Sequence, residues 1–134
     1  MWGIATEQVA PGPPPRDIFH ITTEADWERA QAEGAYSLST RGLTLAQVGF
    51  VHCAFCEQVS GVANSFFRGV AKLVVLRIAI DRLNVEVRYE DLQGSRELFP
   101  HVYGPLNLDA VVATVPLPAG TDGTFTFSVP PSRP

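Results

Sequence analysis

The stretch LVVLRIAI at residues 73–80 is apolar at every position except Arg77. A short apolar run of this kind is typical of a strand that is covered on both faces, at the centre of a sheet. The segment VEVRYE at residues 85–90 alternates instead, which is typical of a strand with one covered face. The pattern therefore predicts a sheet built around residues 73–80, with further strands at 18–22, 85–90, 110–115 and 124–129.

The helices are expected in the first half of the chain. Thr23 has the position of an N-cap and Gly34 that of a stop, which predicts a helix over residues 24–33. Apolar residues at helical spacing predict a second helix over residues 54–68. Between them, residues 35–40 are expected to form a short strand that is followed by a loop. Because the helices precede most of the strands, the order favours an α+β fold with a largely antiparallel sheet.

The composition indicates a single globular domain. The chain has 134 residues, of which 46% are hydrophobic and 18% charged. A net charge of −4 argues against non-specific nucleic-acid binding, and no apolar run is long enough for a membrane helix. We expect a cytoplasmic protein that does not bind membranes, and nothing in the sequence specifies its oligomeric state. The domain is expected over residues 17–129, after an extended Pro-rich segment at 1–16 and before a tail at 130–134.

The segment FPHVYGPLN at residues 99–107 is expected to be a stiff loop. Pro100 and Pro105 restrict their own backbones and those of the residues before them. In an extended backbone His101 and Tyr103 point to the same side. The loop is therefore either the wall of a binding site or a well-fastened corner.

All three histidines have apolar or aromatic neighbours, in IFHIT, GFVHCAF and FPHVY. One such histidine is more often a buried, hydrogen-bonded side chain than a catalyst. With His20, His52 and His101 all in such surroundings, a structural and a functional role are about equally favoured. His52 also precedes the helix expected from residue 54, where it either helps to bind an anion or caps the helix.

Three further features have two interpretations each. Cys53 and Cys56 form a C-x-x-C motif, but no second pair of metal ligands accompanies it, so we expect two reduced thiols and no metal. Glu90 is either a general base or the solvated edge of a sheet. Tyr36, with Ser39 nearby, is either a stacking platform for a ligand or a core aromatic residue.

The order of the motifs IFHIT, GAYSLS, GFVHCAFCEQV, LVVLRIAID, VEVRYE and FPHVYGPLN resembles a bacterial family, domain of unknown function 952. The resemblance covers residues 18–127 and is most specific in the GF-HC and FPH-YGPL elements. It implies an ADP-ribosyltransferase-like fold, with a split, largely antiparallel sheet and two main helices. In that superfamily, His20 would contact a ribose, Tyr36 would pack against nicotinamide, and Glu90 would orient the reacting ribose.

The resemblance implies a transferase or glycohydrolase that acts on NAD, on a related nucleotide or on a 2′-phosphorylated substrate. NAD would then be a substrate, and no cofactor is specified. The catalytic residues implied are His20, Glu90 and His101, and the substrate-binding residues are Tyr36, Ser39, His52, Gln58 and Tyr103. Two alternatives stay open: a non-catalytic module that binds a nucleotide or another small molecule, and an acid–base enzyme that uses the same pocket without NAD. In each case we expect the three histidines, Tyr36 and Tyr103 to meet at one pocket with Glu90 at or near its rim.

Overall fold

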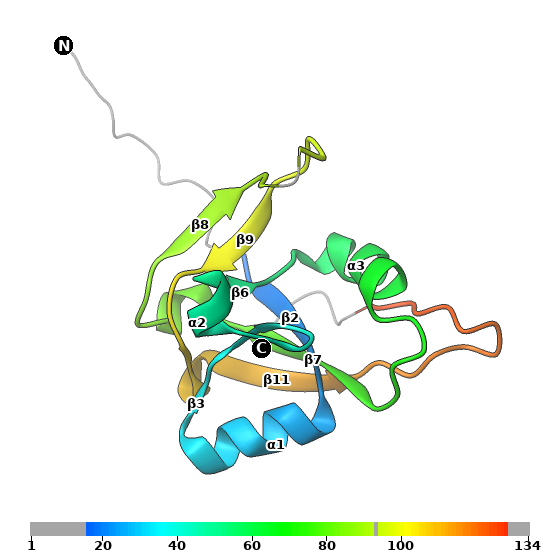
Figure 1. The fold of residues 1–134 in the computed structure, drawn as a ribbon, viewed down its shortest axis with the longest axis horizontal. Helices are drawn as coiled ribbons and strands as arrows, with labels where there is room; N and C mark the ends of the chain where they lie inside the picture. The colour runs from blue at the N-terminus through cyan, green and yellow to red at the C-terminus, as the bar shows by residue number, and fades with distance from the viewer. Residues whose placement is uncertain (1–15, 93, 129–134) are drawn as a thin grey trace.

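The computed structural model describes residues 16–92 and 94–128 (Figure 1). Its central sheet has the order β11-β7-β2, and both pairings are antiparallel. The middle strand β7 (Leu73–Ile78) is the apolar run expected at the centre, with β2 (Ile18–Thr23) and β11 (Val111–Pro116) on either side. The expected position of residues 73–80 is confirmed, except that the strand ends at Ile78.

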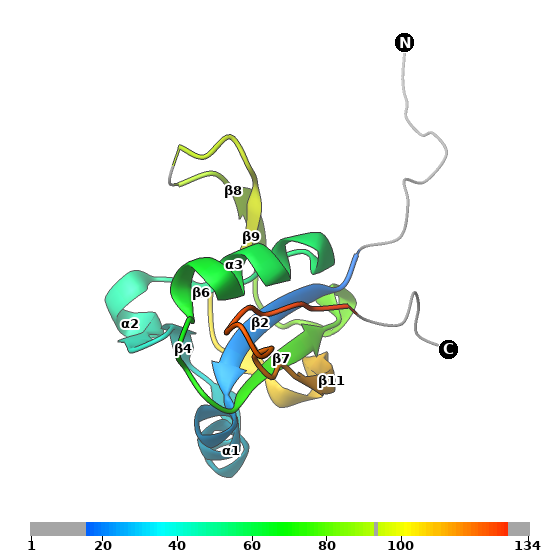
Figure 2. The ribbon, with the colours of Figure 1, turned by 90° about the vertical axis from the view of Figure 1, so that its right-hand side faces the viewer.

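Both faces of β7 are covered, as its continuous apolar sequence requires. Leu76 and Ile78 belong to a hydrophobic cluster that includes Ala30 of helix α1 (Glu24–Glu33). Leu73 and Val75 face the other way, into a cluster that includes residues of helix α3 (Val59–Phe66). Figure 2 shows the central sheet between these two helices. The one charged residue of the run, Arg77, pairs through Nε with Asp17 Oδ2 at 2.7 Å, so its charge is compensated where it is largely buried.

A second three-stranded sheet has the order β6-β9-β8 and is also antiparallel. It consists of β6 (Val51–His52), β9 (Phe99–Val102) and β8 (Val87–Glu90). The hairpin of β8 and β9 stands out from the rest of the chain at the top of Figure 1. The first four residues of FPHVYGPLN were expected in a loop but form strand β9. They do so because β9 lies between β6 and β8, and the sequence of a single segment does not reveal such partners.

Two short antiparallel ladders complete the strands. One joins β3 (Ala35–Tyr36) to β10 (Leu106–Asn107), and the other joins β4 (Leu38–Thr40) to β5 (Leu43–Thr44). All strand pairs within the described residues are antiparallel. The expected α+β class with a largely antiparallel arrangement is confirmed.

The first helix, α1, has the expected bounds, with the Asp26 amide donating to the Thr23 side chain at 3.1 Å. The second begins later than expected: α3 spans Val59–Phe66 and follows a 3-10 turn, η1 (Cys56–Gln58). A β-bridge between Ala54 and Phe19 keeps the chain extended at residue 54, where the helix was expected to start.

Three short helical segments complete the structure: α2 (Leu45–Val48), within the expected loop, and two 3-10 turns, η2 (Ile80–Arg82) and η3 (Leu108–Ala110). None of the helices in residues 16–92 and 94–128 has the length and apolar character of a membrane span.

Residues 124–128 do not form the expected strand, and residue 129 lies outside the described residues. Their partner is helix α3. The Phe125 amide donates to Asn64 Oδ1 at 2.8 Å, Asn64 Nδ2 donates to the Phe125 carbonyl at 2.9 Å, and the Phe127 amide donates to Ser60 Oγ at 2.8 Å. Phe125 and Phe127 are buried, so the alternation correctly indicated a covered face but not what covers it. The Pro-rich segment, apart from Arg16, and the tail also lie outside the described residues.

The chain turns from β9 into β10 at Gly104, against Val85. Gly104 has φ 157°, and a Cβ added there would lie 2.6 Å from Val85 Cγ1 and 3.0 Å from Val85 Cβ. Hydrogen bonding also fixes the turn, since the Tyr103 amide donates to the Glu86 carbonyl at 2.8 Å. Only glycine allows this close approach without a shift of the backbone or of Val85.

We expect Gly104→Ala to lower the free energy of unfolding by about 1–3 kcal/mol, because the new methyl group overlaps Val85. Urea denaturation measures the change. Gly61→Ala is the matched control, since Gly61 lies within α3 with no atom close to an added Cβ, and it should be neutral or slightly stabilising. In a Val85→Ala background the loss at Gly104 should shrink, and equal losses in both backgrounds would contradict a clash with Val85.

Candidate active site

A cavity of about 320 Å³ lies beside the two three-stranded sheets. Its lining includes four of the side chains singled out in the sequence: His20 of β2, His52 of β6, Glu90 of β8 and His101 of β9. The rest of the lining is largely apolar and aromatic, and includes Phe19, Phe66, Phe67 and Phe99. The expected convergence is therefore found for these four side chains, although His20 and His101 lie about eighty positions apart in the sequence.

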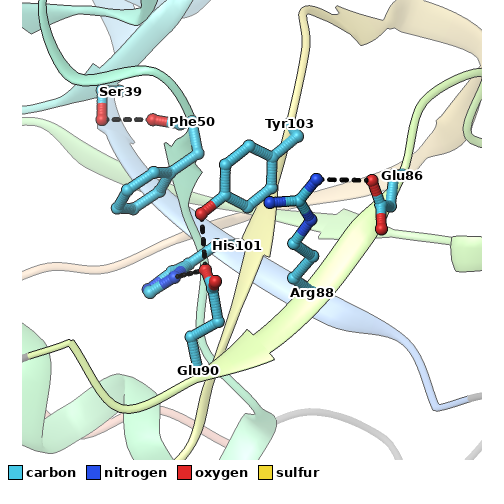
Figure 3. A network of polar contacts seen from close by, with 7 residues as sticks. All are labelled: Ser39, Phe50, Glu86, Arg88, Glu90, His101 and Tyr103. Atoms are coloured by element: carbon cyan, nitrogen blue, oxygen red, sulfur yellow. Dashed lines mark hydrogen bonds and ion pairs between the residues drawn. The ribbon is translucent and has the colours of Figure 1, made fainter.

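Glu90 and His101 form a hydrogen-bonded pair at the cavity (Figure 3). Glu90 Oε1 lies 2.9 Å from His101 Nδ1 and accepts from the Tyr103 hydroxyl at 2.6 Å. The two residues are diagonal neighbours on one face of the β8–β9 ladder, where Glu90 is paired with Phe99 and His101 with Arg88. The Tyr103 hydroxyl, and then His101, hold the pKa of Glu90 below its ordinary value. Glu90 is therefore a carboxylate at neutral pH.

A carboxylate can only accept, so His101 carries its proton on Nδ1 when the ring is neutral. Within the described residues no hydrogen bond occupies the other ring nitrogen, Nε2. His101 is 4% exposed and lines the cavity. The pair thus provides an oriented imidazole at the cavity with one nitrogen that makes no hydrogen bond within the described residues.

Phe50, which the sequence analysis did not select, holds the His101 ring in place. The two rings are stacked with centroids 4.1 Å apart, and Phe50 also lies 4.7 Å from the ring of His52 and 5.3 Å from that of Tyr103. The Ser39 hydroxyl donates to the Phe50 carbonyl at 2.5 Å and is fully buried. Figure 3 shows Phe50 beside both His101 and Tyr103. Phe50 stands directly before Val51 and His52 in the GFVHC motif, and this position could have identified it as a site residue from the sequence.

His52 lies directly opposite His101 in the β6–β9 ladder, and the ring centroids are 5.4 Å apart. No hydrogen bond to its ring occurs within the described residues. Burial, and then the positive charge that His101 carries when protonated, lower the pKa of His52, so the His52 ring is neutral at pH 7. The expected place of His52 at a helix start is wrong, because the residue is in a strand and the first helical turn begins at Cys56. The anion site at a helix start is therefore not formed there.

His20 is hydrogen-bonded on both sides within the protein. Its Nδ1 lies 2.5 Å from the His52 carbonyl, which can only accept, so Nδ1 carries the proton. Its Nε2 then accepts from the Tyr36 hydroxyl at 2.7 Å, and Tyr36 Oη is also 3.0 Å from Thr22 Oγ1. Burial lowers the pKa of His20 to about 4, and the side chain is 2% exposed. His20 is a neutral part of the cavity wall with no free ring nitrogen.

The other expected binding residues do not line this cavity in the described structure. Tyr36 lies behind His20 and Tyr103 behind Glu90, each bonded to a lining residue, while Ser39 holds Phe50. The Gln58 amide is used within the protein: it accepts from the Phe55 amide at 2.9 Å and donates to the Leu98 carbonyl at 2.9 Å. In the described structure these residues hold other residues in place and do not line this cavity, so their expected role in binding stays a prediction.

The two cysteines are separate thiols in the structure. Cys53 is buried, and burial raises the pKa of its thiol, which makes it a poor nucleophile. In residues 16–92 and 94–128 no three His, Cys, Asp or Glu side chains are grouped so that they could hold a metal ion.

Fold and cavity together define a small α+β protein in which two antiparallel sheets border a site lined by histidines. The chain belongs to the family described as protein of unknown function (DUF952), whose model matches residues 21–114.

The crystal structure of protein CC0527 from Caulobacter crescentus is similar, with 31% identity and a TM-score of 0.72 over 82% of this chain and 93% of that one. The solution NMR structure of CC0527 has 31% identity and a TM-score of 0.68 over 81% and 90% of the two chains. A search among curated proteins finds no match.

Proposed function

We propose that this protein is an enzyme that carries out acid–base chemistry on a small molecule bound in the cavity, with His101 as the residue that exchanges the proton. The observation that carries the proposal is the Glu90–His101 pair. Glu90 holds the proton of His101 on Nδ1, so Nε2 can accept a proton from a ligand, and the carboxylate stabilises the imidazolium that results. Glu90 is then the positioning residue of the pair.

His52 supplies a second imidazole next to the first. Its ring centroid is 5.4 Å from that of His101, and its lowered pKa leaves it neutral at pH 7. Two adjacent imidazoliums repel each other, so a proton on one ring disfavours a proton on the other. This arrangement suits a reaction in which one atom of the substrate loses a proton while another gains one.

The lining favours a ligand with a ring. Phe19, Phe66, Phe67 and Phe99 present an apolar aromatic surface, while the polar groups are few. Binding sites for small molecules combine an apolar wall with a small number of oriented polar groups, and a volume of about 320 Å³ is at the low end of their usual size. A single ring system with one or two polar substituents suits this volume.

A second candidate is ADP-ribosyltransferase-like chemistry on NAD or a related nucleotide. The aromatic wall suits a nicotinamide ring, and Glu90 at the cavity is an acceptor for a ribose hydroxyl. The roles implied for His20 and Tyr36 fit less well. Both nitrogens of His20 are bonded inside the protein, and Tyr36 does not line the cavity. The first proposal needs neither of these residues to touch the ligand.

The test is a panel of NAD, ADP-ribose, mononucleotides, a 2′-phosphorylated RNA end and small ring-bearing acids and alcohols. Thermal shift detects binding, because a ligand at a hundred times its dissociation constant stabilises by about 2.7 kcal/mol. NMR spectra of the mixtures detect turnover. Turnover without nicotinamide supports the acid–base enzyme, nicotinamide release supports the second candidate, and binding without any turnover contradicts both and favours a binding module.

A further inference from the structure

Arg41 lines the cavity, and no carboxylate among residues 16–92 and 94–128 pairs with it. It lies in the turn between β4 and β5, is exposed, and is the only arginine or lysine among the residues described as lining the cavity. Its one hydrogen bond in the described structure is long, 3.4 Å from Nη1 to the Phe66 carbonyl. Asp26, which shares a smaller hollow with Arg41, pairs with Arg29 instead. Most of the donors of the Arg41 guanidinium are therefore without a protein acceptor.

An exposed aromatic side chain lines the same cavity as this cation. Phe66 is 57% exposed, lines the same cavity, and contacts Arg41 through its carbonyl. Leu92, which is 60% exposed, lines the cavity as well, and exposed apolar side chains that gather at a cavity form a surface that a ligand can cover. Phe66 and Arg41 together therefore suit a ligand that has an anionic group next to a flat apolar part.

Charges on the other lining residues restrict where an anion can bind. Glu90 and Asp91, both in the lining, are carboxylates that would repel it. His52 and His20 are neutral at pH 7 because their pKa values are lowered. The whole chain also carries a net charge of −4, and Arg41 is the one described lining side chain with a permanent positive charge, so it is the group best suited to attract an oxyanion into this cavity.

We propose that the ligand carries an oxyanion, a phosphate or a carboxylate, that binds Arg41 while the ring of the ligand covers Phe66. This rests on the proposed function in so far as it uses the same cavity. With the anion at Arg41, the rest of the ligand lies in the cavity that Glu90 and His101 also line. Arg41 is thus the residue that selects charged ligands and sets their orientation.

The experiment titrates the full-length protein with phenyl phosphate, benzoate and neutral benzyl alcohol, and follows backbone NMR shifts of cavity residues. At least one anionic probe should bind about tenfold or more tightly than benzyl alcohol, because charge-assisted hydrogen bonds are the stronger class. Comparison of phenyl phosphate with benzoate shows which oxyanion is preferred. Affinity for the anions should fall with added salt.

Arg41→Met should weaken the binding of the anionic probe by about 10- to 100-fold and leave benzyl alcohol unchanged. Arg82→Met is the matched control, because Arg82 is exposed, does not line the cavity, and its loss changes the net charge equally. Equal binding of neutral and anionic probes, no binding of any probe, or unchanged binding in Arg41→Met would each overturn the inference.

The result of this binding experiment can be distinguished from the result of the turnover test of the proposed function. Anion binding that depends on Arg41, in a protein that turns over none of the panel, would support this inference and contradict the enzyme. If turnover depends on His101 while anion binding does not depend on Arg41, the enzyme is supported and this inference is contradicted.

Discussion

Replacing His101 with glutamine is expected to lower kcat/KM by about 100- to 10,000-fold on whichever panel compound is turned over. Glutamine keeps a polar side chain of similar length but cannot take up a proton. Alanine is a poorer choice, because His101 is 4% exposed and stacked on Phe50, so its removal would leave a hole beneath that ring. Steady-state kinetics of the wild type and the variant measure the effect.

Two further variants make the result specific to the Glu90–His101 pair. Glu90→Gln should also lower kcat, because a neutral amide stabilises the imidazolium less well than a carboxylate does. Tyr103→Phe removes one of the two hydrogen bonds to Glu90 Oε1 and leaves the pair intact, so its effect should be smaller. If His101→Gln keeps wild-type kcat/KM, or loses activity only because its urea midpoint collapses, His101 does not carry the chemistry.

The free energy of unfolding is expected to fall by about 3 kcal/mol between pH 7 and pH 4 because of His20 alone. Burial lowers the pKa of His20 to about 4 in the folded protein, whereas the ordinary value is 6.5. Between these values the unfolded chain binds a proton that the folded chain does not. The contribution is therefore fully present above pH 6.5 and is lost as the pH falls towards 4.

Urea denaturation at several pH values measures this dependence, and His20→Asn is the control. The Asn amide can still donate to the His52 carbonyl but does not titrate, so the variant should be less stable at pH 7 and lose less on acidification. Because carboxylates also titrate near pH 4, the informative quantity is the difference in slope between the two proteins. Equal slopes from pH 6.5 to pH 4 would show that His20 is not held neutral.

Local patterns were sufficient for the elements that depend on neighbours in the sequence. Thr23 caps the first turn of α1 and Gly34 ends the helix, and their hydrogen bonds reach only a few residues along the chain. The apolar run of β7 demands cover on both faces wherever it lies in the fold. The antiparallel α+β class followed from the order of such elements.

Local patterns failed where the partner is distant. Residues 99–102 form a strand because β6 and β8 flank them, and residues 124–128 are held by helix α3 instead of by a strand. The alternation of apolar residues was visible in the second case, but alternation specifies a covered face and not the element that covers it.

The same distinction between local pattern and distant partner applies to the candidate site. The sequence predicted that His20, His52, His101, Tyr36 and Tyr103 meet at one pocket with Glu90 at or near its rim. The histidines and Glu90 line the cavity, whereas the two tyrosines do not. Only the tertiary structure separated their roles, by joining Glu90 to Nδ1 of His101 and by occupying both nitrogens of His20. Arg41 had no sequence signal, since what distinguishes it is that none of the carboxylates in the described fold pairs with it. Whether a polar group is free or bonded depends on residues far away in the chain, and that information exists only once the chain has folded.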